Sequence, residues 1–229
     1  MIEVQGLWKR YPGMWGLQDV SLQFEKGRVV GVLGENGSGK SSMFRILAGV
    51  SRASRGSASV DGVPVGKQTR GVTSYLPEVD PYYTWMTVAR QLKFLSAFYD
   101  GWDDAKKNDL LDLLELDPDK KIGELSRGQR GRLKVVAAFS RRSRLVIMDE
   151  PLSGIDPPSR RRILEAVFGQ FRTEEQTMLI STHIVSEVEP FIDDVVYMRN
   201  GEAVLIGSAD RLREEKKGTL SDIFEEVIT

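Results

Sequence analysis

Apolar and polar residues alternate along the first part of the chain. Between residues 1 and 27, apolar positions such as Ile2, Val4 and Phe24 are separated by polar ones. Alternation with a period of two is typical of strands that bury one face. We therefore predict two antiparallel strands joined by a turn at Pro12-Gly13, because proline and glycine favour turns.

Short apolar runs in the rest of the chain predict buried strands. They occupy residues 28–33, 72–76, 145–148 and 177–181. Runs of this length are typical of parallel strands that are covered on both faces. Residues 56–62 predict a further strand that ends in an Asp-Gly turn, and the tail from Ala203 predicts a last strand followed by helices.

Apolar spacings of three and four residues predict helices between these strands. Thr87 can cap a helix whose apolar residues recur at Val88, Leu92, Leu95 and Tyr99. Other helices are expected at residues 42–47, 130–139 and 158–171 and around Leu110, Leu111 and Leu114. The order of elements predicts one α/β domain over 1–229, in which 1–77 and 126–229 form the core. An N-terminal antiparallel β-subdomain belongs to that core, and residues 78–125 form an inserted α-helical subdomain.

Composition restricts the partners that the chain can have. A net charge of −1 and a sequence pI near 6.0 indicate no nucleic-acid partner. No apolar run approaches the length of a membrane span, and the N-terminus does not resemble a signal peptide. Cysteine is absent, which excludes disulfides and thiolate metal sites. We expect a cytoplasmic protein that reaches a membrane only through a partner.

The segment Gly34–Ser42 matches the phosphate-binding loop pattern G-x-x-x-x-G-K-[ST] and lies between a predicted strand and a predicted helix. Its glycines let successive N–H groups point inward, and the helix dipole favours anions. Lys40 would reach the β- and γ-phosphates of ATP, and the Ser41 hydroxyl would ligate Mg²⁺. The expected nucleotide-binding residues here are Gly34, Asn36, Gly37, Ser38, Gly39, Lys40, Ser41 and Ser42. The core is thus predicted to be a P-loop NTPase core of the RecA-like type.

Carboxylates at a strand end supply the rest of the hydrolytic chemistry. Asp149 ends an apolar strand and would hold Mg²⁺, while Glu150 can orient and deprotonate the attacking water. His183, the only histidine, follows another buried strand and would contact the γ-phosphate. Tyr11 precedes the Pro12-Gly13 turn, and its ring can either stack on adenine or serve packing alone.

Two clusters admit more than one interpretation. Basic residues follow the segment Leu125–Gln129, and we interpret them as a solvated helix face or as phosphate contacts rather than as a nucleic-acid patch. An aromatic cluster in the helical segment either fills a local core or receives a membrane partner. The aromatic residues are Tyr82, Tyr83, Trp85 and Phe94.

Taken together, these motifs resemble the motif set of the ATP-binding subunit of ABC transporters. In order along the chain they are Tyr11, Gly34–Ser42, Pro77-Glu78, Leu125–Gln129, Leu145–Glu150, Ser153–Asp156 and His183. The likeness spans nearly the whole chain, and the Leu-Ser-x-Gly-Gln signature is specific to this superfamily. The helical segment, with Trp85–Val88, is most similar to bacterial single-domain subunits that serve ABC-2-type exporters.

This resemblance implies a mechanism and partners. Two copies, or one copy and a paralogous subunit, are expected to face head to tail around ATP and Mg²⁺. The signature residues Ser126, Arg127, Gly128 and Gln129 would contact the partner's ATP, and Asp156 would lie at the dimer interface. Integral membrane permease subunits would hold the protein at the inner face of the cell membrane, with no nucleic-acid partner.

Two positions depart from the family pattern. Glu78 stands where the family usually has glutamine; it can ligate Mg²⁺ but cannot donate a hydrogen bond to water while ionised. Arg127 replaces the first glycine of the signature, and its guanidinium would either raise ATP affinity or project into solvent. Neither change removes Lys40, Asp149, Glu150 or His183.

Other members of the superfamily offer alternatives to a transporter subunit. DNA-repair members carry a coiled coil before the signature, and no sustained heptads separate Lys40 from Ser126. Translation factors usually carry two cassettes, whereas this chain has one. A soluble iron–sulfur assembly ATPase is of similar size and stays an alternative. A small-molecule kinase would leave the signature unexplained.

Overall fold

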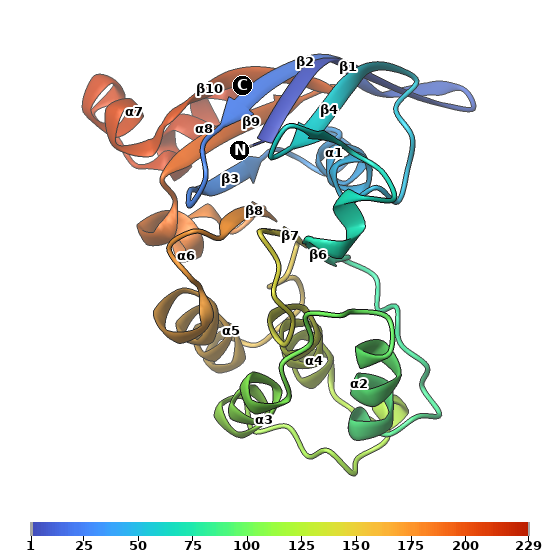
Figure 1. The fold of residues 1–229 in the computed structure, drawn as a ribbon. Helices are drawn as coiled ribbons and strands as arrows, with labels where there is room; N and C mark the ends of the chain where they lie inside the picture. The colour runs from blue at the N-terminus through green and yellow to red at the C-terminus, as the bar shows by residue number, and fades with distance from the viewer. Residues whose placement is uncertain (1, 229) are drawn as a thin grey trace.

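The computed structural model describes residues 2–228 and contains two sheets with helices packed around them (Figure 1). The first sheet is four-stranded and antiparallel, in the order β2-β1-β4-β5. Its strands are β1 (Ile2–Tyr11), β2 (Met14–Phe24), β4 (Arg55–Val60) and β5 (Val63–Pro64). Both predicted turns are present. At the second, Asp61 and Gly62 have φ of 51° and 75°, as a two-residue hairpin turn of type I′ requires.

The second sheet is six-stranded, in the order β10-β9-β3-β8-β7-β6, and only its edge strand β10 runs antiparallel. Its strands are β3 (Val29–Leu33), β6 (Thr73–Leu76), β7 (Leu145–Asp149), β8 (Thr177–Thr182), β9 (Asp194–Arg199) and β10 (Glu202–Ser208). Every residue of β3, β7 and β8 is buried, as their apolar runs predict. Strand β9 was not predicted, although residues 195–198 form the same kind of apolar run.

The α-helices lie on both faces of this sheet and at one end of the molecule (Figure 1). They are α1 (Lys40–Leu47), α2 (Val88–Ser96), α3 (Asp104–Leu113), α4 (Arg127–Phe139), α5 (Pro157–Leu164), α6 (Val185–Val188), α7 (Ala209–Lys216) and α8 (Leu220–Ile228). The helix predicted over 158–171 is α5 followed by a π-helical segment, Glu165–Phe171. The α/β class with an N-terminal antiparallel sheet is confirmed.

Helix α2 begins where predicted but ends earlier. The Thr87 hydroxyl accepts a hydrogen bond from the Arg90 N–H, which is the expected cap. Tyr99 was expected inside this helix, but α2 ends at Ser96. The Tyr99 ring lies under the Arg141 guanidinium, with 3.6 Å from Cζ to the ring centroid. A tertiary cation–π contact thus outweighs the local spacing of apolar residues.

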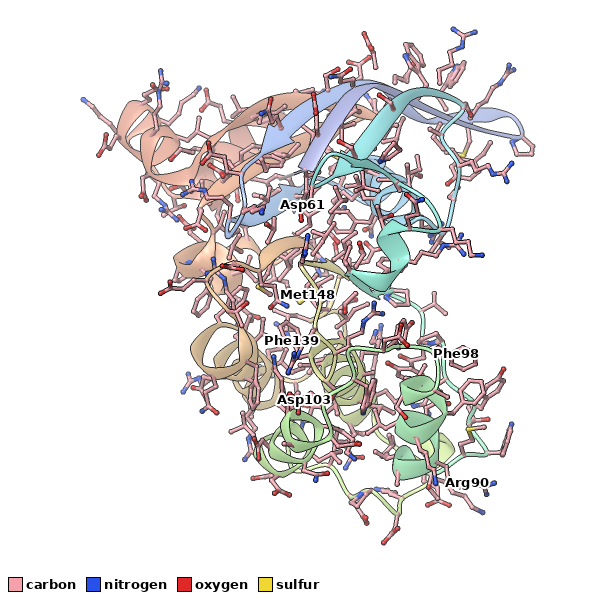
Figure 2. All side chains as sticks on the ribbon, in the orientation of Figure 1. Asp61, Arg90, Phe98, Asp103, Phe139 and Met148 are labelled. Carbon is pink, nitrogen blue, oxygen red and sulfur yellow. The ribbon has the colours of Figure 1, made fainter. Side chains whose placement is uncertain are left out.

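Helix α4 joins the helical end of the molecule to the large sheet. One apolar cluster includes Leu92 of α2, Leu110 of α3, Phe139 of α4 and Met148 of β7. Figure 2 shows Phe139 between Met148 and the start of α3 at Asp103. The helical region and the large sheet thus share one apolar core. The predicted boundaries of the inserted α-helical subdomain, residues 78 and 125, stay a prediction.

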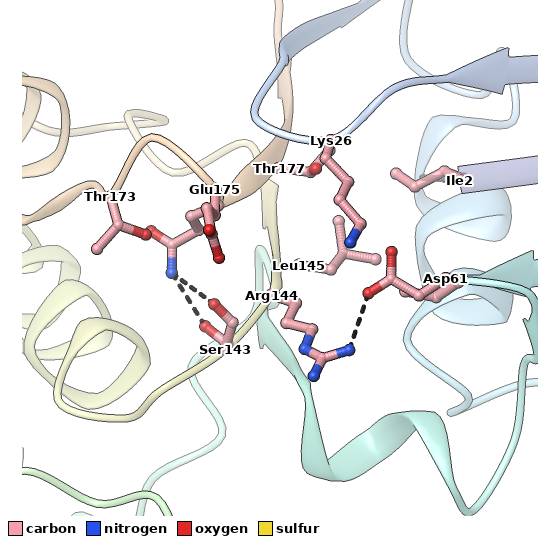
Figure 3. Close-up of a pocket in the computed structure, with 11 residues that line it drawn as sticks. Ile2, Lys26, Asp61, Ser143, Arg144, Leu145, Thr173, Glu175 and Thr177 are labelled. Atoms are coloured by element: carbon pink, nitrogen blue, oxygen red, sulfur yellow. Dashed lines mark hydrogen bonds and ion pairs between the residues drawn. The ribbon is translucent and has the colours of Figure 1, made fainter.

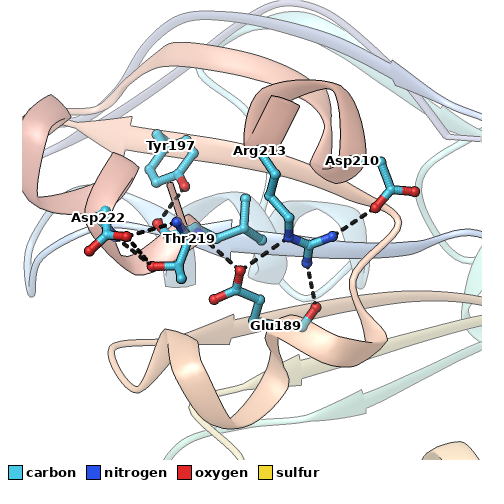
Figure 4. A network of polar contacts seen from close by, with 7 residues as sticks. Glu189, Tyr197, Asp210, Arg213, Thr219 and Asp222 are labelled. Atoms are coloured by element: carbon cyan, nitrogen blue, oxygen red, sulfur yellow. Dashed lines mark hydrogen bonds and ion pairs between the residues drawn. The ribbon is translucent and has the colours of Figure 1, made fainter. Parts of the chain in front are cut away.

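The C-terminal helices are fixed to the core by a polar network (Figure 4). Glu189, which follows α6, accepts hydrogen bonds from the Arg213 guanidinium (3.1 Å) and from the Leu220 N–H (2.9 Å). The buried Tyr197 hydroxyl on β9 donates to the Leu220 carbonyl at 2.8 Å. The N-terminus of α8 is therefore tied both to the large sheet and to the segment after β8.

Replacing Glu189 with alanine removes the acceptor for two hydrogen bonds and leaves the partly buried Arg213 with Asp210 as its remaining charge partner. We expect the free energy of unfolding to fall by about 1–3 kcal/mol. Urea denaturation measures the loss. Glu215→Ala is the matched control, because Glu215 pairs with Arg211 on an exposed surface and should change stability by less than about 0.5 kcal/mol. Equal effects of the two substitutions would contradict this interpretation.

Candidate nucleotide site

The predicted nucleotide residues meet at the carboxyl ends of three adjacent parallel strands. Gly34 follows β3, Glu150 follows β7 and His183 follows β8. In open α/β sheets this edge is where ligands bind. A hollow of about 320 Å³ lies here, and its lining includes Tyr11, Asn36, Gly37, Gly39, Lys40, Ser41, Ser42, Glu78 and Glu150.

The phosphate loop is held in a conformation that requires glycine. Gly39 has φ of 108°, and a Cβ there would lie 2.5 Å from the Gly16 carbonyl oxygen. The buried Lys40 ammonium donates to the carbonyls of Gly34 (2.7 Å) and Glu35 (2.9 Å), and burial lowers its pKa. The buried Ser38 hydroxyl has no hydrogen-bond partner among the described residues. A loop with an unpartnered buried hydroxyl and a curled backbone fits a bound phosphate.

Asp149 is buried and accepts three hydrogen bonds. Its donors are the hydroxyls of Ser41 (3.0 Å), Ser181 (3.0 Å) and Tyr75 (3.2 Å). Ser41 was predicted from the phosphate-loop motif, whereas Ser181 and Tyr75 were not predicted. Ser181 could have been found as a polar residue inside an apolar strand. It lies opposite Asp149 in the register of β7 and β8.

Glu150 is 7% exposed and bonds to the predicted histidine. The distance from His183 Nδ1 to Glu150 Oε2 is 2.8 Å, and Glu150 Oε1 lies 3.9 Å from Lys40 Nζ. Its backbone has φ of 47°, a conformation that costs a residue with a side chain about 1–3 kcal/mol. The Glu150 N–H donates to Ser181 Oγ at 2.9 Å, which supports this turn.

Oxygen donors suited to Mg²⁺ are adjacent at the mouth of the loop. The Ser41 hydroxyl and the Asp149 carboxylate are in contact, and Glu78 lines the same hollow as Ser41. Among the described residues there is no group of three or more His, Cys, Asp or Glu side chains that could hold a metal by themselves. Mg²⁺ commonly takes few protein ligands together with phosphates and water, so this donor set fits it.

Tyr11 borders the hollow from the antiparallel sheet. Its hydroxyl is 3.3 Å from Ser42 Oγ, and its ring lies so close to Gly16 that a Cβ there would be 2.7 Å from it. The ring is therefore held beside the loop, where a base can stack on it. The structure brings Tyr11, the phosphate loop, Glu78, Asp149, Glu150 and His183 together in one place.

The signature residues begin helix α4 with a capping box. The Ser126 hydroxyl accepts from the Gln129 N–H at 3.2 Å, and the Gln129 side chain accepts from the Ser126 N–H at 3.0 Å. Gly128 faces Asp156, which caps α5 through Ser159. Arg127 packs its guanidinium against Gly154 and lines a second hollow together with Glu78.

Several basic residues in and just after α4 do not belong to a solvated face, so that expectation was wrong for them. Lys134 is buried and donates to the carbonyls of Pro77 (3.2 Å) and Glu78 (3.0 Å). Arg132 donates to the Leu114 carbonyl and to Ser159 Oγ, and Arg141 donates to two carbonyls of the segment before β6. These cations connect α4 to surrounding loops, the Glu78 loop among them, because buried carbonyls need donors.

A separate polar hollow of about 220 Å³ lies at the opposite ends of the strands (Figure 3). Leu145 and Thr177 begin β7 and β8 there, and the Arg144 guanidinium is 3.3 Å from the Asp61 carboxylate. None of the predicted site residues lines it. The predicted site residues therefore lie at the carboxyl ends of the strands and not at the opposite ends.

A protein-family model described as "ABC transporter" matches residues 17–153. The ABC transporter ATP-binding protein YtrB of Bacillus subtilis (strain 168) is 31% identical over 217 residues, covering 94% of this chain and 74% of YtrB. From the same organism, the linearmycin resistance ATP-binding protein LnrL is also 31% identical over 217 residues, covering 91% and 69%.

Solved structures show the same fold. The structure of an ATP binding subunit of an ABC transporter superposes with a TM-score of 0.88 at 27% identity and covers 100% of both chains. A dimeric ATP-binding cassette bound to ADP and phosphate gives a TM-score of 0.82 at 19% identity, covering 91% of this chain and 98% of that one. No helix in residues 2–228 has the length and apolar character needed to cross a membrane.

Replacing Ser181 with alanine tests whether this hydroxyl positions the two carboxylates. The change removes one of the two hydroxyls that donate to Asp149 Oδ1 and leaves the Glu150 N–H without its acceptor, so we expect stability to fall by about 1–3 kcal/mol and ATP hydrolysis to slow. Steady-state kinetics and thermal unfolding measure both effects. The control is Ser74→Ala, since the Ser74 hydroxyl is equally buried but bonds to the Ala138 carbonyl. If Ser181→Ala hydrolyses ATP at the natural rate, the positioning role is wrong.

Proposed function

The chain belongs to the ABC transporter family and is an ATP-hydrolysing ATP-binding subunit, and on that premise we propose that two copies enclose ATP and drive a separate membrane permease in export. The family membership confirms the resemblance drawn from the motifs. The proposal adds the dimer, Mg²⁺, the permease, the direction of transport and a location on the inner face of the cell membrane.

The observation that carries the proposal is the contact between Glu150, His183 and Lys40 at the phosphate loop. Lys40 and the loop N–H groups would bind the β- and γ-phosphates. Ser41, Asp149 and Glu78 would hold Mg²⁺, which supplies charge neutralisation during phosphoryl transfer. Glu150 would orient the attacking water and accept its proton, and His183 would hold the Glu150 carboxylate and reach the γ-phosphate.

The start of α4 supports the head-to-tail dimer. The first N–H groups of a helix have no acceptor within the helix, and its dipole favours an anion there. The capping box uses the N–H groups of Ser126 and Gln129, and Gly128 adds no side chain above the first turn. Ser126–Gln129 would therefore bind the γ-phosphate held by the other copy, with Asp156 beside it at the interface.

An exposed aromatic patch supports a permease partner. The patch consists of Tyr83, Trp85, Phe94 and Phe98, which are 40–66% exposed and contact one another at centroid distances of 5.1–5.9 Å. Tyr82 of the predicted cluster packs inward instead, against the core. Beside the patch lies a hollow of about 490 Å³, whose lining includes Val50, Arg70, Tyr75, Leu95 and Phe98. Exposed apolar surface of this kind marks interaction sites.

Export is proposed from the likeness to LnrL, which is named for resistance to linearmycin, and from the similarity of the helical segment to exporter subunits. Resistance to a toxic compound is commonly achieved by moving it out of the cell. The soluble iron–sulfur assembly ATPase has no specific observation in its favour.

Glu150→Gln tests the dimer and the base together. The amide cannot accept the water proton, so we expect hydrolysis to fall by about 10²- to 10⁴-fold while ATP still binds. Analytical ultracentrifugation should then show a monomer without nucleotide and a stable dimer with Mg-ATP. Glu214→Gln, an exposed glutamate of α7, is the control. A monomer with ATP bound would contradict the homodimer, and unchanged hydrolysis would contradict the role of Glu150.

Replacing Trp85 and Phe98 together with alanine tests the permease surface. We expect the isolated protein to hydrolyse ATP normally, because both side chains are exposed and neither lines the nucleotide hollow. With a crosslinker at position 94, the unchanged protein should capture a multi-spanning membrane protein in native cells. The double variant should no longer capture it. Val204→Ala with Ile206→Ala is the control, since these residues are exposed on β10. If the double variant still crosslinks to the same membrane protein, the permease does not depend on the aromatic patch for binding.

A further inference from the structure

The tip of the β1–β2 hairpin carries a surface that the nucleotide site does not use. We call it the basic–tryptophan patch, and it comprises Trp8, Arg10, Trp15, Arg52 and Arg55. Arg10, Trp15, Arg52 and Arg55 are exposed, and Trp8 is partly buried. Tyr11 and Met14 of the same hairpin line the nucleotide hollow, whereas none of the five patch residues does.

Ring and strand contacts hold the patch together on one face. The rings of Trp8 and Trp15 meet edge to face at 5.3 Å, and the Arg10 guanidinium lies 5.3 Å from the Trp15 ring. Arg55 pairs with Trp8 across β1 and β4, and residues paired in this way share a face of the sheet. The Lys9 ammonium donates to the Arg52 carbonyl at 2.8 Å, so the segment that carries Arg52 contacts β1.

The patch has positive charge that carboxylates do not neutralise. Residues 4–18 and 36–60 contain no Asp or Glu. Among residues 2–228, none of the ion pairs within 4 Å involves Arg10, Arg52 or Arg55. The first carboxylate along β2 is Asp19, four residues beyond Trp15. Although the net charge of the chain is −1, cations are concentrated in the basic–tryptophan patch.

The patch borders the surface proposed for the permease. Val50 lines the hollow beside the aromatic patch, and Arg52 lies two residues further along the chain. The Arg70 guanidinium, on the rim of that hollow, bonds to the Gly49 carbonyl. Figure 1 shows the hairpin tip and helix α2 on the same side of the molecule. A permease bound there would bring the hairpin close to the bilayer.

We propose that the basic–tryptophan patch binds the anionic headgroups of the membrane surface next to the permease. Arginine side chains attract acidic lipids, and the amphipathic tryptophan ring favours the headgroup level of a bilayer. The location beside the permease surface rests on the proposed function, whereas the chemistry of the patch does not. A nucleic acid would also attract arginines, and the test below separates the two partners.

The test is co-sedimentation of the full chain with vesicles that contain no permease. We expect binding to vesicles of phosphatidylcholine with phosphatidylglycerol, weak binding to phosphatidylcholine alone, and a decrease with added salt. Arg10→Gln, Arg52→Gln and Arg55→Gln combined should lose roughly 100-fold in affinity for the anionic vesicles, since each cation contributes about fivefold at such a surface. Tryptophan fluorescence should shift to the blue on binding and stay unshifted in this variant.

The charge-matched control combines Lys121→Gln, Arg142→Gln and Lys217→Gln, which alter exposed cations elsewhere and should leave vesicle binding unchanged. Retained ATP hydrolysis in both variants shows that they fold. Equal binding by the patch variant and the control overturns the proposal, as does salt-sensitive binding to single-stranded RNA without binding to vesicles. Failure of the permease crosslink with intact vesicle binding would overturn the proposed function alone.

Discussion

The structure depends on a group of buried charges at the ends of three parallel strands. Lys40, Asp149 and Glu150 are each at most 7% exposed, and burying them is costly unless each finds partners. Two loop carbonyls, three hydroxyls and His183 provide these partners, and they come from segments that three strands position, namely β3, β6 and β8. The register of β7 with β8, the strained turn at Glu150 and the curl of the phosphate loop all serve the same cluster.

Sequence patterns predicted the parts of the fold that local chemistry determines. The apolar runs of β3, β7 and β8, the Pro12-Gly13 and Asp61-Gly62 turns and the Thr87 cap are each specified by a few neighbouring residues. The patterns failed where distant contacts decide. Tyr99 leaves the helix because Arg141 holds its ring, and Lys134 is buried because the Glu78 loop offers it carbonyls. No local spacing contains that information.

The candidate site shows the same division. Tyr11, Lys40, Asp149, Glu150 and His183 belong to motifs with fixed spacing, so their convergence could be predicted. Ser181 and Tyr75 support Asp149 only through strand register, which a single sequence does not specify. Arg127 was expected at a phosphate or in solvent; it is exposed, and its guanidinium lies against Gly154. Its direction depends on a loop that approaches from elsewhere in the chain.

That contact has a consequence for how this protein can evolve. A Cβ at Gly154 would overlap the guanidinium of Arg127, and the backbone of Gly154 has φ of 64°. The overlap can be relieved when the flexible, exposed Arg127 side chain rotates away, whereas the positive φ disfavours a side chain at 154 whatever stands at 127. Position 154 should therefore stay glycine in descendants of this chain, while position 127 is free to vary.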